Sequence, residues 1–141
     1  MNNAISLSWF IIRRCAGKKH PISNLQLQKM LYFLQRLNLQ KKGRALFDNK
    51  IFAWQFGPVV RDVYYEFSIY SSLRIIPNDY DPNPIINLED FLLDEIDNRA
   101  KQKPWSMVDE THQPGKAWDL IYKNGKGNGR EIPLELIETN G

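Results

Sequence analysis

The chain has 141 residues, of which 43% are hydrophobic and 12% aromatic, and its formal net charge is +3. This length predicts a single domain over residues 1–141, and the composition excludes an intrinsically disordered chain. The single cysteine, Cys15, excludes an intramolecular disulfide and indicates the cytoplasm, and no apolar run approaches the roughly 20 residues of a membrane span.

The first third of the chain predicts two helices. Apolar residues at helical spacing indicate a helix from Ala4 to about Arg14, and the basic residues follow the apolar stretch, unlike those of a signal peptide. Ser23 and Gln26 fit a capping box that begins the clearest helix, which runs to about Gln40. We expect this helix to be central to the core because it carries an apolar stripe, formed by Leu27, Met30, Leu31 and Leu34.

The middle of the chain predicts a small ribbon and a third helix. Ile51–Phe56 is short, aromatic and bounded by turn signals, as is typical of a strand, and Leu73–Pro77 is expected to be a second strand. Gly57 permits a sharp turn, and a proline suits the first position of a helix. We therefore expect a helix over Pro58–Tyr70, followed by a loop at residues 78–84.

The last third predicts further helices. Asn87 and Asp90 have cap spacing and begin a helix that runs to about Lys103, where Pro104 interrupts it. The glycine-rich segment Lys123–Arg130 predicts a flexible connection, and it lacks the Gly-Lys-Ser/Thr of a phosphate loop. Short helices are expected at Trp105–Thr111, at Lys116–Lys123 and after Ile132-Pro133. The fold class is therefore mainly α, a compact helical fold of about five to seven helices with one short β-ribbon.

His112 is the best candidate for chemistry. It could act as a general base with Asp109 or Asp119 as the orienting group. It could also use one ring nitrogen to bond a backbone carbonyl and hold its loop against Trp118, which is the interpretation we favour. Thr111 is the only hydroxyl beside it in the sequence, and adjacent side chains do not necessarily face each other.

Two further sites are weighed against structural alternatives. Cys15 and His20 could form a thiol–imidazole pair, although a small buried cysteine at a helix end is the favoured interpretation.

Two histidines and one cysteine, scattered along the chain, do not predict a zinc site. A magnesium site is imaginable on a dense set of carboxylates, but a solvated helix face explains them better: Glu89, Asp90, Asp94, Glu95 and Asp97. The sequence thus predicts no cofactor, no metal and no catalysis.

The aromatic residues beside glycine and proline breaks are candidates for a binding surface. Trp54 and Phe56 alternate, so an extended segment would point both the same way, either into the core or into a groove for a partner. The same alternatives apply to Trp105 and Trp118.

The charge distribution is uneven. Residues 1–50 hold ten Lys or Arg and one acidic residue, whereas residues 51–100 hold three Lys or Arg and nine acidic residues. These oppositely charged parts either pack together or leave a basic face for an acidic partner. Phosphate contacts would come from Lys18, Lys19, Lys29, Arg36, Lys41, Lys42 and Arg44. The link between the first two helices, residues 18–24, is longer than a helix-turn-helix normally uses.

Several of these motifs, taken in order, resemble one known family. They are Gln28–Leu34, Gly43–Asp48, Ile51–Val60, Thr111-His112-Gln113 with Trp118 six residues after the histidine, and Ile132-Pro133. Over roughly residues 5–139 the chain resembles the SocA-like Panacea antitoxin domain family, which is also catalogued as phage-associated.

The resemblance implies a mostly helical protein without an established reaction. It implies an antitoxin that neutralises a toxin protein, encoded by an adjacent gene, through direct contact, in one type as an adaptor that delivers the toxin to a cytoplasmic protease. Trp54, Phe56, His112 and Trp118 are the expected partner-binding residues. The alternatives are a prophage-encoded DNA-binding or regulatory protein, and an uncharacterised enzyme with His112 beside a carboxylate in a pocket.

Overall fold

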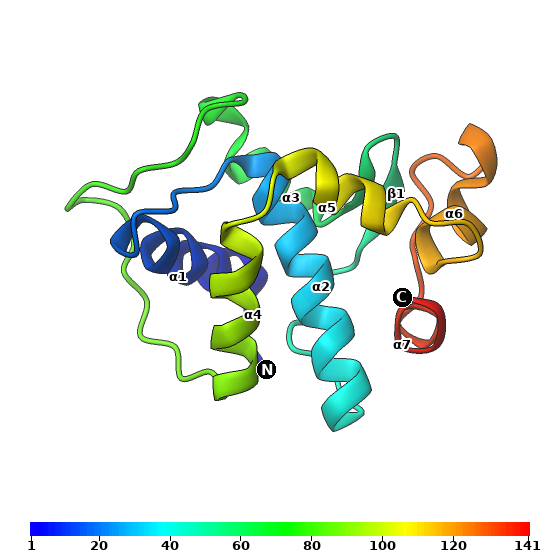
Figure 1. Ribbon diagram of the computed structural model, residues 1–141, viewed down its shortest axis with the longest axis horizontal. Coiled ribbons are helices and arrows are strands. Elements are labelled where there is room, and N and C mark those ends of the chain that lie inside the picture. Colours follow the sequence, from blue (N-terminus) through cyan, green and yellow to red (C-terminus); the bar gives the residue numbers. More distant parts are fainter.

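The computed structural model describes residues 1–141 and is mainly helical, with one antiparallel ribbon (Figure 1). In chain order the elements are α1 (Ala4–Gly17), α2 (Asn24–Lys42), β1 (Phe52–Trp54), β2 (Gly57–Val59), α3 (Arg61–Glu66), the 3₁₀ turn η1 (Ser68–Tyr70), α4 (Asp90–Ala100), α5 (Pro104–Thr111), α6 (Ala117–Tyr122), η2 (Lys123–Gly125) and α7 (Leu134–Asn140). The predicted fold class is confirmed. None of these helices combines the length and the apolar character that crossing a membrane requires.

The central helix is α2, around which α1, α4, α5 and α7 pack (Figure 1). Its predicted capping box is confirmed: the Ser23 N–H donates to Gln26 Oε1 at 2.9 Å, and the Gln26 N–H donates to Ser23 Oγ at 3.4 Å. Gly43 ends the helix in the left-handed conformation. The predicted apolar stripe is fully buried and forms the middle of the core: Leu27, Met30, Leu31 and Leu34.

The ribbon is a tight hairpin. β1 pairs antiparallel with β2, with Ala53 opposite Pro58, and the turn between the strands contains only Gln55 and Phe56. Gly57 has a φ of +114°, a conformation that residues with a Cβ rarely adopt. This glycine lets the chain reverse at once, so β1 pairs with the segment directly after it.

The prediction of a strand at Leu73–Pro77 is wrong. This segment forms no strand, and its one backbone hydrogen bond to a distant part of the chain runs from the Ile75 N–H to the Ile22 carbonyl at 2.8 Å. The Ile75 side chain is buried, whereas Leu73 and Ile76 on either side of it are exposed. Of the apolar residues that suggested a strand, only Ile75 packs into the core, and it anchors a loop.

The predicted helix start at Pro58 is also wrong. Pro58 is the middle residue of β2, and α3 begins only at Arg61. The Pro58 carbonyl accepts a hydrogen bond from Lys29 Nζ at 3.0 Å. The Pro58 carbonyl is thus bonded to a side chain of α2, whereas in a helix it would accept a backbone N–H of the next turn. The predicted helix over Pro58–Tyr70 is instead two shorter elements, α3 and η1.

The glycine-rich segment Lys123–Arg130 is not the flexible connection that its composition predicts. Its second half runs beside β1, where the Gly129 N–H donates to the Ala53 carbonyl at 2.7 Å. The Ala53 N–H in turn donates to the Arg130 carbonyl at 2.8 Å. The hairpin therefore has a neighbouring chain on the side of β1, although this chain is too irregular to form a strand.

The helix predicted from Asn87 to Lys103 is shorter than expected. It begins at Asp90, after Glu89 in an extended conformation, and it ends at Ala100. Pro104 is the first residue of α5, and a proline disfavours helical geometry in the residue before it. Lys103 is accordingly extended, so the proline begins the next helix and also limits the previous one.

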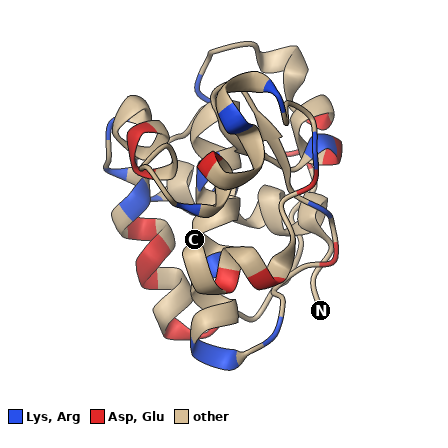
Figure 2. Ribbon diagram, turned by 90° about the vertical axis from the view of Figure 1, so that its right-hand side faces the viewer, with Lys and Arg blue, Asp and Glu red and all other residues tan.

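The oppositely charged parts of the chain pack together, which is the first of the two interpretations of the charge pattern. Arg14 Nε lies 2.8 Å from Asp97 Oδ1, and Lys18 Nζ lies 3.1 Å from Asp97 Oδ2. Lys42 Nζ lies 3.0 Å from Glu89 Oε2. Figure 2 accordingly shows Lys and Arg segments interleaved with Asp and Glu segments. Part of the basic charge of the first 50 residues is therefore neutralised within the fold.

Candidate partner-binding cleft

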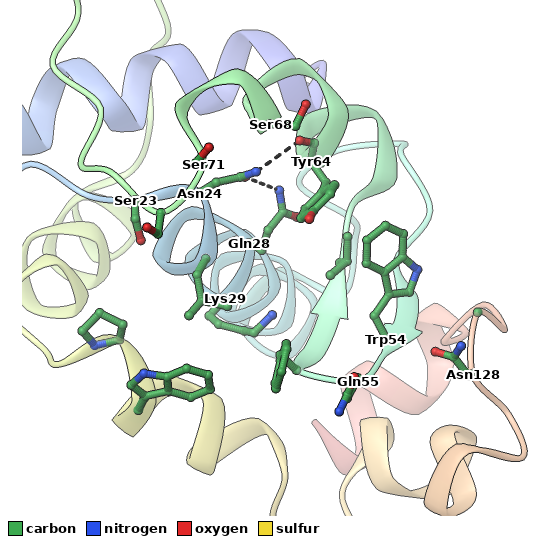
Figure 3. A pocket seen from close by; sticks show the side chains of 17 residues that line it. Ser23, Asn24, Gln28, Lys29, Trp54, Gln55, Tyr64, Ser68, Ser71 and Asn128 are labelled. Atoms are coloured by element: carbon green, nitrogen blue, oxygen red, sulfur yellow. Dashed lines mark hydrogen bonds between the residues drawn. The ribbon is translucent and has the colours of Figure 1, made fainter.

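An open cleft of about 690 Å³ lies between the first half of α2, the β1–β2 hairpin, α3 and the start of α5. Figure 3 shows Asn24 and Gln28 projecting from α2 toward Tyr64 of α3, and Lys29 projecting from α2 toward the hairpin that carries Trp54. Small polar side chains complete the lining: Ser23, Ser68, Ser71, Ser72, Gln55 and Asn128. We refer to this hollow as the cleft.

Two aromatic pairs form the walls of the cleft. Trp54 meets Tyr64 edge to face, with ring centroids 4.9 Å apart, and Phe56 meets Trp105 in the same manner at 5.5 Å. Phe56 is 50% exposed and Trp105 is 57% exposed. Large aromatic side chains that remain exposed around a concave surface are typical of binding sites.

The floor of the cleft is a hydrogen-bonded row of buried polar side chains on α2. Gln28 Nε2 donates to Asn24 Oδ1 at 3.0 Å, and Asn24 Nδ2 donates to the Tyr64 carbonyl at 3.1 Å. Gln28 Oε1 accepts from the Val60 N–H at 2.9 Å. This row fixes the chain between β2 and α3 against α2, so the walls of the cleft are held at a defined distance from its floor.

Lys29 extends this row toward the hairpin. Its side chain is fully buried, and Nζ donates to the Pro58 carbonyl at 3.0 Å. Burial lowers the pKa of Lys29 to about 7, because a low-dielectric interior disfavours the ammonium. The expectation that Lys29 contributes to an outer basic face for phosphates is therefore wrong: its side chain lies in the floor of the cleft.

His112 and Trp118 lie behind the hairpin. The two rings stack with centroids 3.8 Å apart, and Trp118 stacks in turn on Tyr122 at 4.5 Å. Trp118 Nε1 donates to the Trp54 carbonyl at 2.8 Å. Trp118 is almost completely buried. The stack thus supports β1 without lining the cleft. His112 packs against Trp118 as expected, but by ring stacking, and its buried Nε2 does not bond the backbone carbonyl that we expected.

His112 lacks the partners that a general base needs. Neither Asp109 nor Asp119 hydrogen-bonds to its ring; Asp119 Oδ2 instead accepts from the Gly115 N–H at 3.0 Å. Its buried Nε2 has no partner in the protein. Burial lowers the pKa of His112, and the charge of Lys29 lowers it further. The Thr111 hydroxyl donates to the Val108 carbonyl at 2.8 Å and does not face the imidazole as an activated nucleophile.

The structure therefore separates the four expected site residues into two groups. Trp54 and Phe56 line the cleft, but they do not share a strand face, because Phe56 belongs to the turn. His112 and Trp118 form the support behind the hairpin. Tyr64 and the polar floor were not predicted from the sequence. The one available signal for the floor is the spacing of the amides at positions 24 and 28, which places both on one face of the helix.

Cys15 and His20 do not form a reactive thiol–imidazole pair, and Cys15 is the small buried residue at a helix end that we favoured. Cys15 is buried, and burial raises the pKa of its thiol to about 12, so the thiol stays protonated. The contact between the two residues is a backbone hydrogen bond, from the His20 N–H to the Cys15 carbonyl at 2.8 Å.

The acidic helix does not gather its carboxylates around a metal position. Glu95 Oε2 lies 3.1 Å from Arg99 Nε, while Asp97 and Glu89 pair with basic residues of α1 and α2. No three His, Cys, Asp or Glu side chains converge. Of the basic residues considered for phosphate contacts, Arg36 also pairs internally, with Glu110 at 3.2 Å.

Comparison with known proteins relates this fold and cleft to one family. A family model described as "Antitoxin SocA-like, Panacea domain" matches residues 27–119. The chain belongs to this family. It is 33% identical to the protein named "Antitoxin SocA" of Caulobacter vibrioides (strain NA1000 / CB15N), over 96% of this chain and 78% of that protein. No solved structure matches.

The Panacea match covers most of the cleft. It includes α2 from Leu27 onward, the hairpin, α3 and α5, so Lys29, Trp54, Phe56 and Trp105 all lie within it. It also includes His112 and Trp118 of the stack behind the hairpin, whereas Tyr122 and α7 lie outside it. Most of the cleft is thus built from the part of the chain that the family model matches, whereas Asn24 of its floor and Asn128 lie outside the match.

Proposed function

We propose that this chain is a cytoplasmic antitoxin that neutralises a toxin protein by direct, stoichiometric contact and without catalysis. Its membership of the SocA-like Panacea family and its similarity to Antitoxin SocA support this function. The observation that carries the proposal is the exposed pair of Phe56 and Trp105 beside the cleft. Burial of such aromatic rings by a partner supplies much of the energy of a protein interface.

The four residues expected to bind the partner have different proposed roles. Phe56 and Trp54 would contact the toxin directly, because both line the open cleft. Trp118 and His112 would act indirectly, since Trp118 holds the Trp54 carbonyl and stacks on His112. Replacing Trp118 is therefore expected to affect both stability and binding, whereas replacing Phe56 is expected to affect binding alone.

The test is to express the protein encoded by the adjacent gene with and without this chain, and to measure growth and complex formation. We expect wild-type chain to relieve toxicity and to form a stable complex. The double variant Phe56→Ala, Trp105→Ala should weaken binding at least thirtyfold, as the loss of two interface aromatics does. Tyr80→Ala removes a fully exposed aromatic ring outside the cleft and is the control. A double variant that binds like the control would remove the cleft from the contact surface.

A second measurement separates neutralisation by occlusion from delivery to a protease. The half-life of the toxin is followed after protein synthesis is stopped, with this chain present or absent. Occlusion predicts an unchanged half-life and a rescue that saturates at one antitoxin per toxin. Delivery to a cytoplasmic protease predicts a shortened half-life that returns to normal when the protease is deleted.

A further inference from the structure

The cleft contains a single charged side chain and no counter-charge. Among the residues that line it, only Lys29 carries a full charge, and none is Asp or Glu. None of the ion pairs of the fold includes Lys29. A buried lysine without a carboxylate partner is uncommon, because an unpaired charge is unfavourable in the protein interior.

The ammonium of Lys29 has hydrogen-bonding capacity that the chain itself does not use. It carries three N–H donors, and its one hydrogen bond goes to the Pro58 carbonyl at 3.0 Å. The hairpin fixes its position: a Cβ added at Gly57 would lie 2.8 Å from Lys29 Cε and 3.2 Å from Nζ. The group therefore sits at a defined place in the cleft floor with donors to spare.

The remainder of the cleft suits a polypeptide. The exposed rings of Phe56 and Trp105 offer apolar contact. Ser68, Ser71 and Gln55 offer donors and acceptors for a peptide backbone. A charge-free surface of this kind around one cation is complementary to a single negative charge with apolar neighbours.

We propose that the cleft binds a segment of the partner protein in which an Asp or Glu side chain lies beside an apolar residue, and that this carboxylate pairs with the Lys29 ammonium. The apolar neighbour packs against Phe56 and Trp105. The inference rests on the proposed function only in that the occupant is a protein.

The pairing has a pH signature. Burial lowers the pKa of Lys29 to about 7, and only the ammonium attracts a carboxylate, so affinity should be highest below pH 7 and fall above it. The other titratable groups that face Lys29 are His112, after α5, and the phenol of Tyr64 on α3; β2 contributes none. Asp109 and Asp119 lie beside His112. Burial lowers the pKa of His112, so its ring is already neutral where Lys29 titrates.

The test uses random 12-residue peptides displayed on phage, selected on the immobilised full-length chain at pH 6.5. We expect wild type to enrich peptides with Asp or Glu beside an aromatic or aliphatic residue. Lys29→Met, which keeps an unbranched apolar side chain in the core, should lose the preference for the acid. The double variant Phe56→Ala, Trp105→Ala should lose the enriched peptides altogether.

A second measurement does not depend on how well the Lys29 variant folds. The most enriched peptide is synthesised with its acid and with the matching amide, and both are titrated into wild type by fluorescence. The amide peptide should bind at least tenfold more weakly at pH 6.5. The acidic peptide should weaken by up to tenfold per pH unit between pH 7 and 8.5, while the amide peptide should not change.

Other outcomes overturn the inference. The inference is wrong if the enriched peptides are basic or uncharged, or if the acidic peptide and its amide bind equally well. It is also wrong if the cleft variants select the same peptides as wild type. The result is independent of the growth test. A chain that relieves toxicity but selects no acidic peptide keeps its proposed function and loses this inference, and a chain that selects acidic peptides but binds no toxin does the reverse.

Discussion

At the scale of single residues, the polar side chains on the inner face of α2 explain both the shape of the cleft and its chemistry. Asn24 holds α3 by a hydrogen bond to the Tyr64 carbonyl, and Gln28 holds the residue before α3 by a hydrogen bond from the Val60 N–H. Lys29 does the same for β2, but it brings a charge into the core. Burial without a carboxylate partner makes this lysine the residue whose protonation should affect the stability of the fold.

Lys29 predicts that stability rises with pH above neutrality. Its pKa is about 7 in the folded chain, whereas an exposed lysine has a pKa of 10.5. Between these values the unfolded chain binds the additional proton, so raising the pH favours the folded state. We expect the free energy of unfolding of wild type to rise relative to Lys29→Met by up to about 1.4 kcal/mol per pH unit. Urea denaturation of both proteins at pH 7.5, 8.25 and 9 measures this difference, and parallel curves would contradict it.

At the scale of the elements, one partly buried arginine, Arg99 of α4, joins α4, α5 and α2. Arg99 donates to the two carboxylate oxygens of Glu110 at 2.7 and 2.9 Å, and its guanidinium lies 3.7 Å from the centroid of the Phe33 ring. Arg36 on α2 also contacts Glu110, at 3.2 Å. Glu110 lies near the end of α5, and its carboxylate contacts Arg99 of α4 and Arg36 of α2. These two contacts hold α5, whose start forms part of the cleft wall, against the central helix.

Glu110→Gln should destabilise the protein at neutral pH. The hydrogen bonds from Arg99 lower the pKa of Glu110, so its contribution is present above the unfolded value near 4.5 and is lost as the pH falls. We expect a loss of about 1 kcal/mol at pH 7, kept modest because the carboxylate is partly exposed. The difference in melting temperature between the variant and wild type should disappear below pH 4.5. Glu135→Gln, which removes a carboxylate that makes no ion pair, is the matched control and should change little.

The elements also show where local sequence signals fail. The start and end of α2 follow from Ser23, Gln26 and Gly43, whose effects depend only on neighbours in the chain. Pro58 satisfies the local rule for a helix start and is nevertheless a strand residue. The competing contact comes from Lys29, which is 29 positions away and invisible to any local pattern.

At the scale of the whole molecule, the C-terminal helix closes the core. Figure 1 shows α7 beside the second half of α2, and Gln40 Nε2 donates to the Glu138 carbonyl at 3.3 Å. Ile137 is fully buried between them and belongs to the same apolar core as α1 and α4. The cleft lies at the other end of α2, at Ser23–Lys29, so stability and binding can be changed separately.

Ile137→Ala should destabilise the fold by about 2–4 kcal/mol, because it removes a buried side chain and leaves a cavity. Leu134→Ala, on the same helix but 41% exposed, should cost less than about 1 kcal/mol and is the matched control. Urea denaturation gives both values. Binding at the cleft should be unchanged while the variant remains folded, and a loss of binding in the folded Ile137→Ala protein would show that the two ends of α2 are coupled.

The sequence by itself determined the helical class, the central helix with its caps, and the family, because helix periodicity, capping and motif order are properties of neighbouring residues. It also offered Trp54 and Phe56 as surface candidates. Only the tertiary structure decided that Lys29 is buried, that the hairpin closes on itself and that His112 supports Trp118. The cleft draws on residues from 23 to 129, which meet only when α2 packs against the hairpin and α5. Its chemistry therefore depends on packing between distant segments, which no local pattern specifies.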